Sequence, residues 1–156
     1  MVAGGLTCHD KYGTARLKMA DRIYIASRAS IPERAAGWRK YRANGVDIVS
    51  SWIDEAGEGQ TADFGELWAR IWREIASCNR LVLYAEPGDF PLKGALVEVG
   101  MALAMEKPIV ACLPGVTLEG RTFRPIGSWI AAKSVTRNDS IMDVMFGERG
   151  GELTDP

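Results

Sequence analysis

Glu98 is the only charged residue in the apolar run from Gly94 to Met105, GALVEVGMALAM. The run predicts a buried helix, and a buried carboxylate is costly unless it has a partner or a function. We expect Glu98 in about the first turn, where the helix dipole favours an anion by about 0.3–1 kcal/mol. An ionised carboxylate in an apolar wall is suited to act as a nucleophile or a general base. The alternative is an ordinary first-turn acid that reaches solvent near the helix end.

Polar residues in three other segments could bind a substrate. Segment 27–30 combines hydroxyls, a guanidinium and the amides of a helix N-terminus, which suits an anion, although a capped turn would have the same sequence. Loop 86–93 could hold a sugar hydroxyl or a phosphate, or it could be an ordinary loop. In segment 50–54 an aromatic ring at a strand end could stack on a nucleobase. The candidate binding residues are Ser27, Arg28, Ser30, Trp52, Asp54, Lys93 and Gly94.

Histidine and motif content narrow the possible chemistry. His9 is the single histidine, and it lies in the N-terminal extension. This rules out zinc catalysis with two or three histidine ligands and argues against a histidine-based nucleophile triad. The chain has neither a G-x-G-x-x-G segment after its first strand nor a Walker A sequence, which argues against dinucleotide redox chemistry and P-loop hydrolysis. We expect acid–base chemistry from carboxylates, tyrosine or lysine.

Composition sets further limits. The chain has 156 residues and a net charge of −1, which suits one domain without the basic field that attracts nucleic acid polymers. No apolar run approaches 18 residues, so we expect no membrane span. The N-terminus lacks a secretory pattern, and Cys8, Cys78 and Cys112 are odd in number and widely spaced. Free thiols of this kind suggest a reducing, cytoplasmic location.

The elements that must position these residues alternate between strands and helices. Strands are expected at 22–27, 46–50, 81–85, 109–113 and near 134–135, with helices at 32–43, 63–77, 94–105 and 140–146. We expect Ser30 as the N-cap of the first helix and Pro32 at its first position. The pattern predicts an α/β fold, a flavodoxin-like or Rossmann-like three-layer sandwich with a parallel sheet of about five strands.

The expected organisation is one domain with two irregular ends. Residues 1–20 are expected to form a flexible extension, residues 21–147 the domain, and residues 148–156 a frayed C-terminus. In parallel sheets, ligands bind beyond the carboxyl ends of the strands. The loops expected there are Ser27–Ile31, Ser50–Asp63 and Ala85–Gly94, and Glu98 follows the third of them.

The order of these segments and the sequence around Glu98 resemble a known family. Gly100, Ala102, Ala104 and the pair Lys107-Pro108 follow Glu98 in a pattern similar to that of the nucleoside 2-deoxyribosyltransferase family. That family includes the 2-deoxynucleoside 5-monophosphate N-glycosidases. The resemblance covers about residues 22–135, and the Glu-x-Gly segment is its most specific part.

The resemblance implies a mechanism and a substrate class. The family's glutamate attacks the anomeric carbon of a nucleoside or nucleotide, the base leaves, and water or a second base resolves the glycosyl ester. The resemblance implies that no metal or cofactor is needed and that the partner is a small molecule. Relatives form dimers or higher homo-oligomers in which a neighbouring subunit completes the site, and loop 125–129 with Trp129 is our candidate for that shared wall.

The chain departs from the family at one position. Relatives carry an aspartate about eight residues before the strand that precedes the glutamate helix, and counting back from Asn79 gives Ile71. Asp63 and Glu66 are the nearest carboxylates toward the start of that helix, so they are our candidates for the leaving-group acid. The departure leaves a second interpretation open, a nucleotide-binding module without turnover. A purely structural oligomerisation domain is a third.

Overall fold

The computed structural model describes residues 21–55 and 61–147, and these form an α/β fold around a parallel sheet. The strands lie in the order β1-β2-β3-β4, and each adjacent pair is parallel. β1 is fully buried and β2 is buried along its middle, as expected for strands covered on both faces. The strands are β1 (Ile23–Ala26), β2 (Arg80–Tyr84), β3 (Ile109–Cys112) and β4 (Val135–Asn138).

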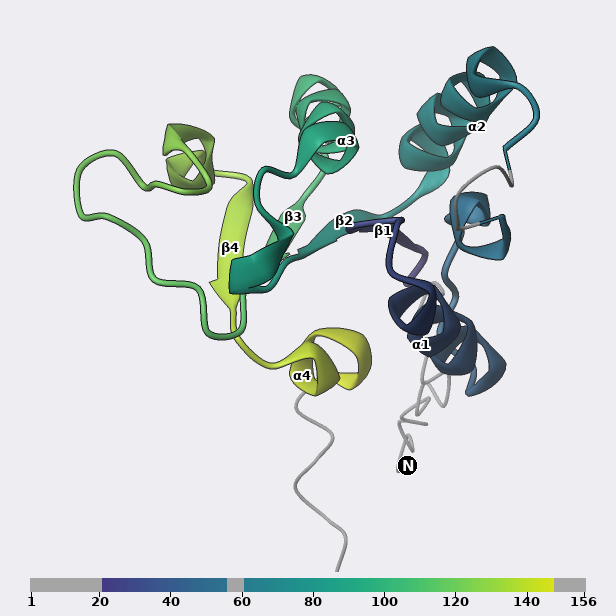
Figure 1. The fold of residues 1–156 in the computed structure, drawn as a ribbon, viewed down its shortest axis with the longest axis horizontal. Coiled ribbons are helices and arrows are strands. Elements are labelled where there is room, and N and C mark those ends of the chain that lie inside the picture. The colour runs from purple at the N-terminus through teal and green to yellow at the C-terminus, as the bar shows by residue number, and fades with distance from the viewer. Residues whose placement is uncertain (1–20, 56–60, 148–156) are drawn as a thin grey trace, which may run out of the picture.

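Helices cover both faces of the sheet. In Figure 1, α2 and α3 lie on one face, and α1 and α4 lie on the other. The three-layer sandwich predicted from the sequence is therefore confirmed. The α-helices are α1 (Pro32–Ala43), α2 (Phe64–Ser77), α3 (Lys93–Ala104) and α4 (Ile141–Phe146), and the short 3₁₀ helices are η1 (Ser51–Asp54), η2 (Pro87–Asp89) and η3 (Ser128–Ala131).

The strand expected at 46–50 is reduced to a single parallel bridge between Ile48 and Ile23. The hydrogen-bond ladder between this segment and β1 stops at the bridge, because beyond it the backbone of β1 bonds to the side chains of Ser50 and Trp52 and not to their backbone. The amide of Ile25 donates to Oγ of Ser50 at 2.6 Å, and Nε1 of Trp52 donates to the carbonyl of Ile25 at 2.8 Å. The named strands are thus four, not five, in the described part of the chain, with the bridge at the β1 edge.

The structure defines the residues at the starts of α1 and α2, for which the sequence made three predictions. Ile31, not Ser30, is the N-cap of α1, and Oγ of Ser30 instead accepts from Nε of Arg28 at 3.0 Å. Asp63 precedes α2 as its N-cap, where its carboxylate accepts from the amide of Glu66 at 3.0 Å. Such caps stabilise a helix by about 1 kcal/mol. Pro32 does occupy the start of α1, as predicted.

α3 differs from the fully buried helix that its apolar sequence suggested. It begins at Lys93, so Glu98 lies past the first turn and gains less from the helix dipole than expected. One side of α3 is buried, whereas Leu96 and Val97 are 37% and 50% exposed. Phe64 and Trp72 of α2 are exposed as well. The oligomeric state expected from the resemblance stays a prediction.

Several other predictions concern residues outside these elements. Cys78 and Cys112 are buried free thiols, while Cys8 lies outside the described residues. The expectations for residues 1–20 and 148–156 also fall outside them. Among the described helices, none combines the length and apolar character needed to span a bilayer. No group of three or more His, Cys, Asp or Glu side chains in residues 21–55 and 61–147 is arranged to hold a metal ion.

Candidate active site

A cavity of about 460 Å³ lies beyond the carboxyl ends of β1 and β2, next to α2 and α3. This volume is within the range of about 300–1,000 Å³ that is common for small-molecule sites. The cavity brings together seven of the residues singled out in the sequence. These are Glu98, Ser27, Arg28, Ser30, Trp52, Lys93 and Gly94.

Glu98 is the buried acid of this cavity, with only 7% of its surface exposed. α3 carries it against the sheet, where the hydroxyl of Tyr24 donates to Oε1 of Glu98 at 2.9 Å. Tyr24 is fully buried in the middle of β1. A buried strand therefore fixes the orientation of the carboxylate, as a reactive group requires.

Burial controls the protonation of this pair. Burial raises the pKa of Glu98 to about 8, against a lowering by the Tyr24 hydrogen bond and with a further rise from the charge of Glu74. Burial and then the charge of Glu98 raise the pKa of Tyr24 well above its ordinary value. Tyr24 therefore keeps its proton and remains a donor, while Glu98 is the group that changes charge near neutral pH.

The wall of the cavity contributed by α2 is apolar. Leu67, Trp68 and Ile71 line it, and Ile71 is only 3% exposed. Ile71 is the residue reached by counting back from Asn79, and the structure places it on the cavity. The next carboxylate along this helix, Glu74, does not line the cavity, and its Oε2 accepts from the amide of Ser51 at 3.2 Å.

The opposite edge of the cavity is polar. Arg28 and Lys93 are exposed there, and the Arg28 guanidinium donates to Oγ of Ser30 and to the carbonyl of Gly88, each at 3.0 Å. Ser27 is buried and accepts from Nε1 of Trp38 at 3.0 Å. This edge combines two cations with hydroxyls beside the first residues of α3, a combination that suits an anionic group.

Three predicted site residues do not reach the cavity. Asp63 caps α2, and Glu66 pairs with Arg73 at 3.0 Å, both in exposed positions. Asp54 pairs with Arg42 at 2.9 Å on the surface. None of the three lines the cavity that contains Glu98. The reason is local, because helix capping and ion pairs with nearby arginines hold these carboxylates at the periphery.

Sequence reasoning missed Tyr24, Trp68 and Asp89 as residues of the site. A tyrosine inside the run Ile23–Ala26 carried a usable signal, since a buried hydroxyl needs a hydrogen-bond partner. Trp68 lines the cavity, whereas Trp72, one turn further along α2, is 54% exposed. Nothing in the local sequence distinguishes the two tryptophans.

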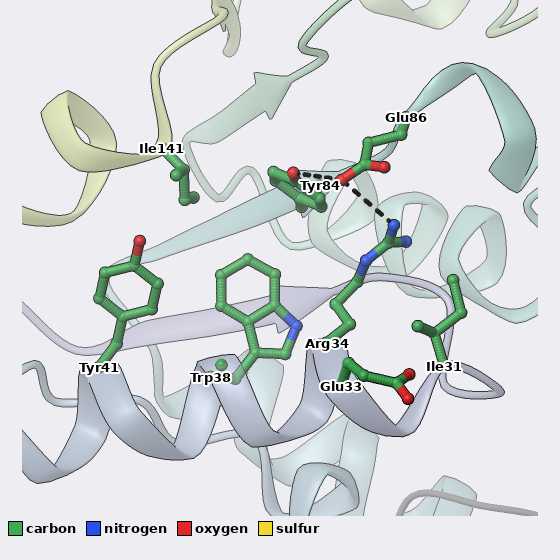
Figure 2. A pocket seen from close by; sticks show the side chains of 9 residues that line it. Ile31, Glu33, Arg34, Trp38, Tyr41, Tyr84, Glu86 and Ile141 are labelled. Carbon is green, nitrogen blue, oxygen red and sulfur yellow. Dashed lines mark hydrogen bonds and ion pairs between the residues drawn. The ribbon is translucent and has the colours of Figure 1, made fainter.

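A second cavity, of about 390 Å³, lies on the other face of the sheet between α1 and α4. Figure 2 shows the rings of Trp38 and Tyr41 and the guanidinium of Arg34 rising from α1 into it. The hydroxyl of Tyr84 donates to Glu86 at 2.6 Å, and Arg34 pairs with the same carboxylate at 3.4 Å (Figure 2). Because these charged groups satisfy one another, we place the candidate active site at the cavity of Glu98.

Asp89 lines the Glu98 cavity and forms an ion pair with Arg34, a residue of the second cavity. Its side chain is 3% exposed, and the ion pair measures 2.5 Å. It also accepts from the amide of Glu86 at 2.8 Å. A carboxylate held by two donors serves to fix the loop after β2, and this loop leads into α3 and Glu98.

The comparisons with known proteins leave the family open. No family model and no curated protein matches the sequence. The solved structures to which the chain is similar include that of the CMP N-glycosidase BcmB from Clostridium botulinum. The two chains are 16% identical with a TM-score of 0.48, over 75% of this chain and 87% of that one. A similarity of this size assigns neither a family nor an activity.

Proposed function

We propose that the protein cleaves the N-glycosidic bond of a nucleoside or a nucleoside 5′-monophosphate, with Glu98 as the nucleophile. One observation carries this proposal: a buried carboxylate, oriented by Tyr24, faces a cavity at the carboxyl edge of a parallel sheet. The cavity offers indole rings for a flat base and cations for a phosphate. These are the parts that such a substrate requires.

The chemistry follows from the placement of Glu98. In its ionised form one carboxylate oxygen attacks the anomeric carbon while the carbon–nitrogen bond to the base breaks. The electron pair of that bond goes to the base, and a glycosyl ester on Glu98 remains. Water or a second base then attacks the same carbon and releases Glu98. Throughout, Tyr24 holds the carboxylate by donating to Oε1.

The test is a base-release assay over nucleosides and their 5′-monophosphates, with and without a free acceptor base. Chromatography that detects free base, absent from reactions without protein, supports the proposal. Products that carry the acceptor base would identify transfer, and free sugar or sugar phosphate would identify hydrolysis. If no compound in a panel of ribo- and deoxyribo-substrates releases base, the proposal is wrong.

Lys93→Ala is expected to discriminate phosphorylated from unphosphorylated substrates. Loss of one charge-assisted contact on an exposed edge should raise KM for a nucleoside 5′-monophosphate about five- to tenfold. KM for the matching nucleoside should stay within about twofold. Lys40→Ala is the matched control, since Lys40 is an exposed lysine of α1 outside the cavity lining. Equal effects of Lys93→Ala on both substrates would show that the phosphate does not bind at this edge.

A non-catalytic nucleotide-binding module is the second candidate function. The observation in its favour is the α2 wall, where the described residues place Ile71 and no acid on the cavity. Calorimetry distinguishes the two functions. Binding of a nucleoside 5′-monophosphate with no base released over hours would favour the module, and release that depends on Glu98 would favour the enzyme.

A further inference from the structure

The charged groups that line the Glu98 cavity are unevenly placed. Among the described residues, the charged side chains on its lining besides Glu98 are Arg28, Lys93 and Asp89. Asp89 pairs with Arg34 and accepts from the Glu86 amide, so its carboxylate is engaged as an acceptor by two donors. Arg28 and Lys93 lie exposed at the polar edge. The α2 wall contributes apolar side chains only.

This arrangement matters for the departing base. A neutral purine or pyrimidine leaves as an anion unless an acid protonates it, and a positioned general acid accelerates such steps by about 10²- to 10⁴-fold. Where relatives of the resembled family carry a carboxylate, this chain has the buried side chain of Ile71. Among the described residues, α2 thus places no acid on the cavity that could protonate a neutral leaving group.

The same cavity has the features that recognise a flat cation. Glu98 is buried, and its hydrogen-bond partner among the described residues is Tyr24, which carries no charge. Neither Arg28 nor Lys93 forms an ion pair with it within the described chain. Trp52 and Trp68 line the cavity beside it. Indole faces attract cationic rings by about 0.5–2 kcal/mol, and a buried carboxylate supplies the opposite charge.

We propose that the substrates are N-glycosides whose base carries a positive charge, namely a pyridinium or an N7-alkylated purine ring. This inference rests on the proposed function and narrows its substrate class. When Glu98 attacks the anomeric carbon, the electron pair of the broken carbon–nitrogen bond neutralises the ring. The base leaves as a neutral molecule, so no proton has to be delivered to it. Water then displaces Glu98 from the sugar and releases one proton to solvent.

A cationic substrate would also influence the charge of Glu98, the nucleophile that attacks it. A cation placed against Glu98 favours the ionised carboxylate and opposes the effect of burial, which raises the pKa of that group. A neutral base offers no such compensation. Binding and activation of Glu98 are therefore coupled through the charge of the base.

The test compares two nucleotides that differ by one methyl group and one charge. 7-Methylguanosine 5′-monophosphate is the cationic substrate, and guanosine 5′-monophosphate is its neutral counterpart. We expect kcat/KM for base release to be at least about 100-fold higher for the methylated compound. Nicotinamide mononucleotide, a pyridinium N-glycoside, should also release its base, whereas cytidine 5′-monophosphate should react as slowly as guanosine 5′-monophosphate.

Variants separate the role of the protein from the intrinsic reactivity of the methylated base. Ile71→Asp installs an acid on the α2 wall and should raise kcat/KM for guanosine 5′-monophosphate about 100-fold, while the value for the methylated nucleotide changes far less. Ile71→Asn is the matched control, and it should leave the ratio between the two substrates as in the wild type. Since Ile71 is buried, folding of both variants is checked by circular dichroism.

Trp68→Leu provides a second readout that does not depend on Ile71. Replacing the half-buried indole should weaken binding of 7-methylguanosine 5′-monophosphate at least about threefold more than binding of the neutral nucleotide. Equal losses for the two ligands would contradict the proposal. Equal kcat/KM for the charged and neutral substrates on the wild-type protein would also overturn it, and would leave the N-glycosidase function intact. Failure of every compound to release base would overturn the function itself.

Discussion

Glu98→Gln is expected to lower kcat/KM for base release by at least about a thousandfold. The amide keeps the size of the side chain and can still accept from Tyr24, but it cannot form the glycosyl ester. Substrate binding should change far less than turnover, because the substitution leaves the aromatic walls and the polar edge in place. Steady-state rates measured from the appearance of free base give the ratio directly.

A control for this result lies at the end of the same helix. Glu106 is an exposed glutamate just after α3 and is not on the cavity. Glu106→Gln should keep its activity within about twofold of the wild type. If Glu98→Gln retains more than about a tenth of the wild-type kcat/KM, Glu98 is not the nucleophile.

The second large expected effect concerns the pH dependence of the free energy of unfolding. The pKa of Glu98 is about 8 in the folded chain, and its ordinary value is 4.5. The folded state therefore holds this proton more tightly than the unfolded state. The stability linked to this group is fully present below pH 4.5 and is lost as the pH rises toward 8, by about 1.4 kcal/mol for each pH unit.

Glu98→Gln should remove that dependence. The free energy of unfolding of wild type minus variant, from urea titrations, should fall by several kcal/mol between about pH 5 and pH 8. Titrating groups that are not coupled to Glu98 are shared by the two proteins and cancel in this difference. A difference that stays constant over this pH range would show that Glu98 is not held in its acid form by burial.

Much of the fold could be predicted from hydrophobic runs. The segments around Ile23–Ala26 and Ile109–Cys112 are continuous apolar stretches, and such stretches mark strands covered on both faces. The strand expected at 46–50 is reduced to a single bridge for a specific reason. The hydroxyl of Ser50 and the indole of Trp52 take the backbone groups of Ile25, and side-chain competition of this kind is not encoded in a propensity.

The candidate site could also be predicted in part. Loops at the carboxyl ends of strands were expected to meet, and residues from Ser27–Ser30 and from loop 86–93 do line one cavity with Glu98. Partners across the fold were not predictable. Tyr24 and Glu98 are 74 residues apart, and their contact depends on how α3 packs on β1. Asp63 lies outside this cavity because its carboxylate is used locally as a helix cap.

Trapping the sugar on Glu98 tests the covalent mechanism most directly. A nucleoside 5′-monophosphate with fluorine at C2′ and a good leaving base should react slowly, because the fluorine destabilises the positive charge that develops at the anomeric carbon. Mass spectrometry of the intact protein should then show the added mass of one fluorosugar phosphate, located on Glu98 by fragmentation and absent from Glu98→Gln. Base release with no covalent adduct, or an adduct on Glu106, would contradict the assignment of Glu98 as the nucleophile.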